Sequence, residues 1–425
     1  MMHAQPLSLG LPDSRTSGLQ DSRTSGLSTS LTFPHLHSSS KHSMFKPYFC
    51  GMTIPTLLWD ICFYAFCAII GIQLFYYLYF FQRLAFFKAP EKETSIEHAV
   101  SVVICARDEA HNLVKTLPGV LVQQYKTTHE VVLVNDNSTD DTKYLVDEFK
   151  KMFKNINYIE LTQEAKMISG KKFPLSMGIK SARHEILLLT DADCVPASEH
   201  WIQRIQECYT DGTEIVLGYG AYHKKPGLLN KLIRFETFHT AIQYLSYAIA
   251  GKPYMGVGRN LSYKKDVFLR NKGFSSINQI PSGDDDLFIN QVARPDNTSI
   301  CIDHDAHTLS EPKTRWSDWM TQKYRHYTTS NYYKSSHKFL LGLYSFSLFW
   351  VYPLLAVSII FYNWWMALAV FGVRFLLQAI VYYKAMKKLN EKDLWPWFLF
   401  FDIWMFFYFI ITVPAIWKAP RKNWD

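Results

Sequence analysis

The sequence is poor in cysteine motifs: it has seven cysteines in 425 residues and no Cys-x-x-Cys pair. An odd, unpaired set argues against a disulfide framework or a zinc site and favours reduced thiols in a cytosolic compartment. No basic patch interleaved with aromatic residues stands out, so nucleic acid is not an expected partner. The segment 256–260, Gly-Val-Gly-Arg-Asn, lacks the third glycine and the strand–helix context of a dinucleotide-binding loop.

Apolar and aromatic side chains are abundant instead, at 48% and 16% of the sequence. They gather in long runs separated by polar stretches, the pattern of a chain with a soluble portion and a membrane portion. The net charge is +8. This excess suits a protein beside anionic lipid or one that handles phosphates, and a positive-inside bias of its loops is the alternative.

The N-terminal segment 1–52 is rich in Ser, Thr, Leu and Gly and repeats Asp-Ser-Arg-Thr-Ser-Gly-Leu at 13–19 and 21–27. One short duplication does not make a solenoid, which needs several stacked units. The composition predicts disorder. A true start at Met44 or Met52 is the alternative reading.

Long apolar runs predict one N-terminal transmembrane helix within 53–83 and two to three C-terminal ones within 338–418. The N-terminal run lacks a small-residue cleavage site, which argues against a signal peptide. The basic linker 384–392 indicates a cytosolic position, and the soluble domain should share that side. Three interruptions in the last run, Pro396, Asp402 and Pro414, leave open whether it crosses fully, tilts or lies partly in the interface.

Two charges, Arg374 and Asp402, fall inside the predicted C-terminal spans. Charges within a membrane are costly and usually paired, so we expect them to face each other or a polar cavity. The alternative is that the span limits are misplaced and both side chains lie near headgroups.

Between the membrane segments, residues 95–330 alternate short apolar runs with amphipathic stretches. Runs 99–106, 130–134 and 185–190 read as buried parallel strands, with helices at 109–124 and 139–153. This series predicts an α/β domain with a doubly wound, mostly parallel sheet and a ligand at the carboxyl ends of its strands. The apolar spacing of 228–249 indicates a helix that packs in the core or on the bilayer surface rather than contacting a ligand.

Two carboxylates, Asp191 and Asp193, follow the apolar run 186–189. Positions i and i+2 of an extended chain point to one side, and two hard oxygen ligands suit Mg²⁺ or Mn²⁺ on a diphosphate. Asp136 follows another strand at the same edge of the sheet and could accept hydrogen bonds from a base or ribose. A solvated loop and helix caps, the latter supplied by 138–140, are the alternatives.

A third acidic group, Asp284-Asp285-Asp286, precedes a stretch of helical spacing. Adjacent carboxylates repel, which raises at least one pKa where solvation is poor, and such a group is a candidate general base. An acidic helix cap is the alternative. Further on, Gln322 and Arg325 share one helix face and could hold a polar ligand.

In this order, the four pieces resemble the family 2 glycosyltransferases, which include cellulose and hyaluronan synthases. Their pattern is an acidic turn, Asp-x-Asp, a Glu/Asp-Asp pair and Gln-x-x-Arg-Trp, and the resemblance covers about residues 99–330. It implies a Rossmann-like GT-A fold, a nucleotide-sugar donor, a glycan or lipid-linked acceptor and inversion at the anomeric carbon.

The resemblance also implies a role for each matched residue. Lys171 would lie near the diphosphate, Asp191 and Asp193 would hold the metal, and Asp285 would be the catalytic aspartate, with Asp284 in place of the usual Glu. Arg259 is assigned, within 258–260, to shaping the acceptor site. The remaining positions expected to bind substrate are Cys105, Arg107 and Glu109 at the nucleotide, Asp136 at the base or ribose, and Gln322 and Arg325 of the last motif.

Three positions depart from the family pattern. Asp108 and Asn135 are mild changes, whereas the tryptophan of the last motif is His326. That tryptophan commonly accompanies the acceptor end in synthases, so His326 argues against a processive polysaccharide synthase. An inactive membrane scaffold is the other rival, and the complete carboxylate set argues against it. The expected protein is an integral membrane glycosyltransferase among membrane lipids, in a bacterial inner membrane, acting in cell-envelope polysaccharide chemistry on the cytosolic face.

Overall fold

The computed structural model describes residues 54–89, 97–162 and 170–412. The predicted disordered segment 1–52 and the end of the last predicted span, 413–418, lie outside these residues. Strands and helices alternate through the first half of the soluble domain, as the apolar runs predict. The elements are β1 (Val100–Ala106), α3 (Ala110–Leu121), β2 (His129–Asp136), α4 (Thr142–Met152), β3 (Ile156–Leu161), α5 (Lys172–Ser181) and β4 (Ile186–Asp191).

The main sheet has the strand order β3-β2-β1-β4-β8-β6-β9 among the described residues. Strands β1 to β4 are parallel, and β8 (Leu261–Lys264) runs antiparallel between β4 and β6 (Ile215–Leu217), with β9 (Thr298–Ile300) at the edge. The prediction of a mostly parallel α/β sheet is therefore confirmed. In the central register Cys105 lies opposite Val134 on one side and Asp191 on the other, so three strands end together at one edge.

Helix packing against the sheet explains why its strands are apolar on both faces. Every residue of β1 is buried, and separate apolar clusters cover the two faces. Helix α5 comes so close that a Cβ on Gly178 would lie 2.7 Å from a Val103 methyl and 2.9 Å from one of Val134. Ligands of open α/β sheets bind at the carboxyl ends of the strands, and Asp191 at the end of β4 lines a cavity.

A second sheet joins β5 (Cys194–Pro196), β10 (Thr308–Ser310) and β7 (Gly220–Tyr222). Its strand β5 begins three residues after the end of β4, so the chain turns at 192–193 instead of continuing the strand. The described residues also form α6 (Trp201–Gln206), α7 (Leu228–Ile249), α8 (Lys265–Arg270), α9 (Asp286–Val292) and α10 (Trp316–Thr329), with 3₁₀ turns at Ser275–Ile277, His304–Ala306 and Ser330–Tyr332.

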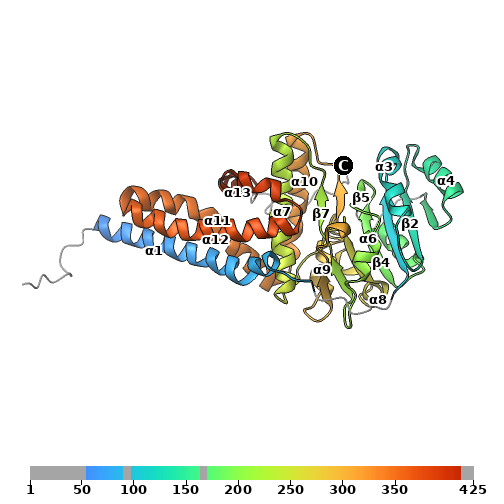
Figure 1. Cartoon of the computed structure of the whole chain (residues 1–425), viewed down its shortest axis with the longest axis horizontal. Helices are drawn as coiled ribbons and strands as arrows, with labels where there is room; N and C mark the ends of the chain where they lie inside the picture. The colour runs from blue at the N-terminus through green and yellow to red at the C-terminus, as the bar shows by residue number, and fades with distance from the viewer. Residues whose placement is uncertain (1–53, 90–96, 163–169, 413–425) are drawn as a thin grey trace, which may run out of the picture. The chain divides into compact units, whose positions relative to one another are not determined.

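Four helical stretches among the described residues are long and apolar enough to cross a membrane: Thr56–Ala85, Ser335–Phe361, Trp364–Lys388 and Lys392–Thr412. The first is not a uniform α-helix: α1 (Ile54–Phe75) passes into a π-helical turn, Tyr76–Phe81, before α2 (Gln82–Ala85). The others are α11 (Ser335–Phe361), α12 (Trp364–Lys388) and a 3₁₀ segment, Lys392–Trp397, leading into α13 (Phe398–Thr412). Helices α1, α11 and α12 lie side by side (Figure 1).

The two charges within the apolar helices meet each other. Arg374 of α12 and Asp402 of α13 are both buried, and Arg374 Nη2 donates to Asp402 Oδ1 at 2.9 Å. Gln73 accepts from Arg374, while Tyr352 and Gln378 donate to Asp402. The prediction that these charges face each other is confirmed, and the paired group joins all four apolar stretches.

Candidate functional site

The first part of the site is the edge where β1 and β2 end. Asp108 adopts a positive φ of 55°, and its Oδ1 accepts from the Thr139 amide at 2.7 Å. Its own amide donates to Ser138 Oγ, and Asp140 accepts from the Ala110 amide at the start of α3. The segment 138–140 thus caps helices, as the capping alternative expected, but it does so across two loops. These bonds hold together the two loops that follow the strands.

Residues expected at the nucleotide lie around this edge. Burial raises the pKa of the Cys105 thiol to about 12, and the charges of Lys171, Asp284, Asp191 and Asp136 all act on it. Cys105 therefore marks the point on which several predicted site residues converge. Burial also raises the pKa of Glu109, to which Asn112 Nδ2 donates at 2.5 Å and whose charge senses Asp193 and Asp191. Arg107 is half-buried in the same loop.

Asp191 and Asp193 come together, although not in the expected way. Asp191 ends β4 and Asp193 lies in the following turn, so the extended-strand argument for their shared direction is wrong. The turn itself brings one carboxylate oxygen from each to within 4.8 Å of the other and of Cys194 Sγ. Cys194, which sequence reasoning missed, donates to Asp193 Oδ1 at 3.3 Å and contacts Ser310 Oγ at 2.9 Å. The buried thiol orients Asp193.

Lys171 forms an ion pair with Asp191. Burial alone would lower the pKa of the Lys171 ammonium, but the Asp191 carboxylate raises it above its ordinary value. Burial would likewise raise the pKa of Asp191, and Lys171 lowers it below the usual range. Burial, with the charge of Asp191 second, raises the pKa of Asp193. A fixed cation thus stands beside the carboxylates where a diphosphate is expected.

The acidic loop 281–286 is shaped by two residues that the sequence reading did not use. Gly283 adopts φ 99°, and a Cβ there would lie 2.4 Å from a Leu287 methyl. Only glycine fits such a position without strain. The buried Lys172 donates to the Ile280 carbonyl, and the negative charges of residues 284–286 act on its ammonium. Gly283 and Lys172 together determine the position of the Asp285 side chain.

Asp285 is held by two backbone amides. Gly258 N donates to Oδ2 at 2.8 Å, and Asp286 N donates to Oδ1 at 2.7 Å, the latter capping α9. Burial raises the pKa of Asp285 to about 8, with the charges of Asp284 and Asp286 contributing and the two amides opposing the rise. One carboxylate of the acidic triplet therefore caps the helix and also has a raised pKa, and its role as a general base stays a prediction.

The Asp286 carboxylate is bound by side-chain hydroxyls, whereas that of Asp285 is bound by backbone amides. Its Oδ2 accepts from Thr329 Oγ1 at 2.5 Å and from Tyr333 Oη at 2.7 Å. Burial is the largest cause that raises the pKa of Asp286, while these hydroxyls lower it. It ties the loop that carries Asp285 to the C-terminal end of α10.

Two neighbouring residues of the turn 256–260 have different surroundings: Arg259 lines the cavity, and Asn260 is buried. Arg259 lines the site, lies 4.3 Å from the centroid of the Tyr222 ring and donates to Ser310 Oγ at 3.2 Å. Asn260 is fully buried and donates to the carbonyls of Tyr219 and Ala306. Asn260 is not among the lining residues of the cavity, and its side chain connects the segments that precede β7, β8 and β10; the role of 258–260 in shaping the acceptor site stays a prediction.

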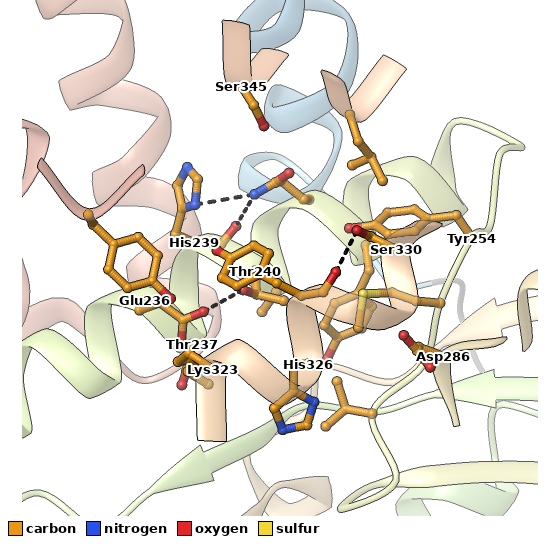
Figure 2. A pocket seen from close by; sticks show the side chains of 18 of the residues that line it. Glu236, Thr237, His239, Thr240, Tyr254, Asp286, Lys323, His326, Ser330 and Ser345 are labelled. Atoms are coloured by element: carbon orange, nitrogen blue, oxygen red, sulfur yellow. Dashed lines mark hydrogen bonds and ion pairs between the residues drawn. The ribbon is translucent and has the colours of Figure 1, made fainter. Parts of the chain in front are cut away.

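The last motif lies on α10 and faces a large cavity. Gln322, Arg325 and His326 all line it, as do Asp191, Arg259 and Asp285. The cavity has a volume of about 920 Å³. Lys323 of the same helix is ion-paired with Glu236 of α7 at its wall. Figure 2 shows Lys323 beside Glu236, His326 at the lower end and Ser345 at the upper end.

Helix α7 also contributes to this cavity, which its apolar spacing did not reveal. Glu236, Thr237, His239 and Thr240 line the wall (Figure 2). Gln243 of the same helix also lines the cavity. Gln243 Nε2 lies 3.2 Å from His239 Nδ1, and Thr240 Oγ1 lies 3.3 Å from Glu236 Oε1. The burial of most of α7 agrees with the prediction that it packs in the core rather than contacting a ligand, and one face of the helix also borders the cavity.

A family model described as "Glycosyl transferase family 2" matches residues 101–269. The glycosyltransferase AglE of Haloferax volcanii is 31% identical over 112 residues, 26% of this chain and 35% of the archaeal protein. The poly-beta-1,6-N-acetyl-D-glucosamine synthase of Staphylococcus epidermidis is 30% identical over 115 residues, 27% of this chain and 26% of the synthase. The chain therefore matches about a third or less of the length of these relatives.

Among solved structures, the mannosyltransferase PcManGT from Pyrobaculum calidifontis, in complex with GDP-Man and Mn²⁺, has a TM-score of 0.53 and 17% identity to this chain. The similarity covers 82% of this chain and 99% of PcManGT. The soluble domain accordingly has the GT-A fold. The match of residues 101–269 to the family 2 glycosyltransferase model agrees with the resemblance that the motifs indicated.

Proposed function

We propose that this chain is an inverting glycosyltransferase that moves a sugar from a nucleotide-sugar donor to an acceptor hydroxyl at the cytosolic face of a membrane. The observation that carries the proposal is one cavity lined by Asp191, Asp285, Gln322 and Arg325. These residues come from three separate parts of the chain and supply a diphosphate-side carboxylate, a base and polar groups for a sugar. The four long apolar helical stretches support attachment to a membrane.

A divalent ion fits the residues on the diphosphate side. The oxygens of Asp191 and Asp193 lie close enough to share one ion, and hard carboxylate ligands suit Mg²⁺ or Mn²⁺. When bound, such an ion neutralises charge on the diphosphate leaving group. The similar fold of PcManGT, whose structure contains GDP-Man and Mn²⁺, supports this assignment.

On the acceptor side, Asp285 acts as the general base. It takes the proton of an acceptor hydroxyl while the hydroxyl oxygen forms a bond to the anomeric carbon. The bond from that carbon to the diphosphate oxygen breaks on the opposite face, so one displacement inverts the configuration. Hydrogen bonds from two backbone amides hold the carboxylate in place, and its raised pKa of about 8 makes it a stronger base than an exposed aspartate.

Lys171 balances charge as the bond breaks. Its ammonium is held by Asp191 at the diphosphate side and can offer its remaining donors to phosphate oxygens. Asp136 and the loop 105–109 lie at the same strand edge and would receive the nucleoside. Acceptor contacts fall to Arg259, Gln322 and Arg325, which line the cavity beyond Asp285.

A second candidate is a processive polysaccharide synthase. The relative named as a poly-beta-1,6-N-acetyl-D-glucosamine synthase favours it, and so does the extension of the cavity along helices long enough to cross a membrane. His326 in place of the family tryptophan favours single transfer. The length of the product distinguishes the two functions.

The test is a screen of the purified chain in detergent against nucleotide sugars, GDP-mannose and UDP-N-acetylglucosamine among them, with Mg²⁺ or Mn²⁺. Release of nucleoside diphosphate from one donor, with an acceptor glycoside present, is expected. Asp285→Asn should retain nucleotide binding and lose transfer. Failure to bind or turn over any nucleotide sugar would exclude the proposed function.

A further inference from the structure

The cavity continues well beyond the residues that the chemistry uses. From Asp285 and Arg325 it extends along α7 to α11 and α13, two of the helices that are long and apolar enough to cross a membrane. Its far half is bordered by Leu341, Phe346 and Phe349 of α11 and by Phe409 and Ile410 of α13. The far half lies beyond the side chains assigned to the donor and to the reacting hydroxyl, so it offers room for a further part of the acceptor.

The side chains of the far half match hydrocarbon better than a glycan. Beyond Gly342 on α11, Ser345 is the one cavity-lining residue of that helix with a hydroxyl; the others, Phe346, Phe349 and Trp350, are aromatic. A glycan placed against these α11 side chains would give up hydrogen bonds to water that aromatic rings cannot replace, although polar side chains of α7 line the facing wall. A hydrocarbon chain gives up none and gains from leaving water.

The far half is also accessible from the side of the apolar helices. Phe346, Trp350 and Ile410 line the cavity and yet are 52%, 38% and 44% exposed. These side chains belong to helix faces that would meet lipid in a membrane. Lys338, in the first turns of α11, lines the cavity at the polar side of this apolar stretch. Along α11 the cation of Lys338 comes first, the hydroxyl of Ser345 next, and the aromatic side chains last. This order matches a lipid, whose polar headgroup is followed by an apolar tail.

Building on the proposed function, we infer that the acceptor is a lipid-linked molecule whose hydrocarbon chain binds between α7, α11 and α13 while its polar head presents the attacking hydroxyl to Asp285. The lipid enters between α11 and α13 from the apolar side. The ion pair of Lys323 with Glu236 then lies between the head and the tail of the bound acceptor.

Gly342 gives a direct way to test the occupant. It lines the far half of the cavity, and a Cβ built on it meets nothing within 4 Å. Gly342→Phe therefore adds a bulky side chain at a lining position whose Cβ has open space around it. Gly372 of α12 is the matched control, because its Cβ also meets nothing within 4 Å and it does not line this cavity. Ser345→Phe fills the same half from the next turn of α11 and serves if Gly342→Phe fails to fold.

The assay compares two acceptors with one sugar head, a methyl glycoside and a dodecyl glycoside, at a fixed detergent concentration with a donor identified by the screen. Each methylene that leaves water should raise kcat/KM about threefold to fourfold, so the dodecyl acceptor should exceed the methyl one by far more than tenfold in the wild-type chain. Gly342→Phe should lower transfer to the dodecyl acceptor at least tenfold and change transfer to the methyl acceptor less than twofold. Gly372→Phe should leave both rates unchanged.

Three outcomes would overturn the inference. Equal rates for the two acceptors in the wild-type chain would remove the hydrocarbon site, and an equal loss of both rates in Gly342→Phe would place the sugar head there instead. Long glycan products that become shorter in Gly342→Phe would identify a growing polymer as the occupant. The proposed function fails separately, when the wild-type chain releases no nucleoside diphosphate from any donor and transfers to neither acceptor.

Discussion

The raised pKa of Asp285 makes a quantitative prediction about pH. With a pKa of about 8, roughly a tenth of the carboxyl is ionised at pH 7 and roughly a hundredth at pH 6. Because the ionised form is the base, kcat/KM for a hydroxyl acceptor should fall nearly tenfold per pH unit below pH 8 and level off above it. An aspartate with an ordinary pKa near 4 would give a flat profile across this range.

Two substitutions identify the group responsible. Asp285→Asn should lower kcat/KM by about 10²-fold to 10⁴-fold, the usual contribution of a general base, and remove the pH dependence. Asp286→Asn removes a neighbouring negative charge that helps to raise the pKa of Asp285, so the profile should move to lower pH. The exposed Asp211 offers the control, since Asp211→Asn should leave the profile in place. A flat wild-type profile, or one that Asp286→Asn does not move, would refute this account of Asp285.

Three further predictions concern the metal carboxylates, the acidic loop and the membrane charges. Asp193→Ala should abolish the Mn²⁺-dependent part of nucleotide binding measured by calorimetry, and a chelator should have the same effect on the wild-type chain; unchanged affinity in either case would contradict the assignment. Gly283→Ala should destabilise the chain by about 1–3 kcal/mol through its positive φ and reduce transfer, as thermal unfolding and kinetics would report. Arg374→Asp and Asp402→Arg should each cost about 3–5 kcal/mol by leaving a buried charge unpaired, and the double swap should recover part of the melting temperature in detergent. Absence of any recovery would argue against direct pairing.

Much of the fold could be predicted because the strands are local, apolar and short. Val100–Ala106 forms β1 within one residue of the predicted run, and helix α7 occupies the predicted range 228–249. The pairing of Arg374 with Asp402 followed from the cost of an unpaired charge in an apolar surrounding, which is a physical constraint independent of register. These predictions succeed because each depends either on the sequence of one segment or on the free-energy cost of one unpaired charge.

The site was less predictable because its side chains are oriented by contacts between distant segments. Lys172 reaches the Ile280 carbonyl, 108 residues away, and thereby positions the loop of Asp285. Asp108 crosses to the loop after β2, so its departure from the family asparagine has a structural consequence that spacing does not reveal. Lys171 forms an ion pair with Asp191. The order of the motifs places both residues near the diphosphate but does not predict that they contact each other.

Helix α7 shows why a cavity is the hardest feature to read from a sequence. Its apolar positions recur at helical spacing, which predicts packing, and its polar positions would ordinarily face water. In the structure Glu236 and His239 are buried as well, because α10, α11 and α13 surround the helix on its polar side. Whether a polar helix face meets water, a neighbour or a ligand depends on where three later helices lie, and those helices are placed by their own apolar contacts. The cavity is therefore a property of the domain assembled with the long apolar helices, and substitutions such as Gly342→Phe must be chosen from the structure.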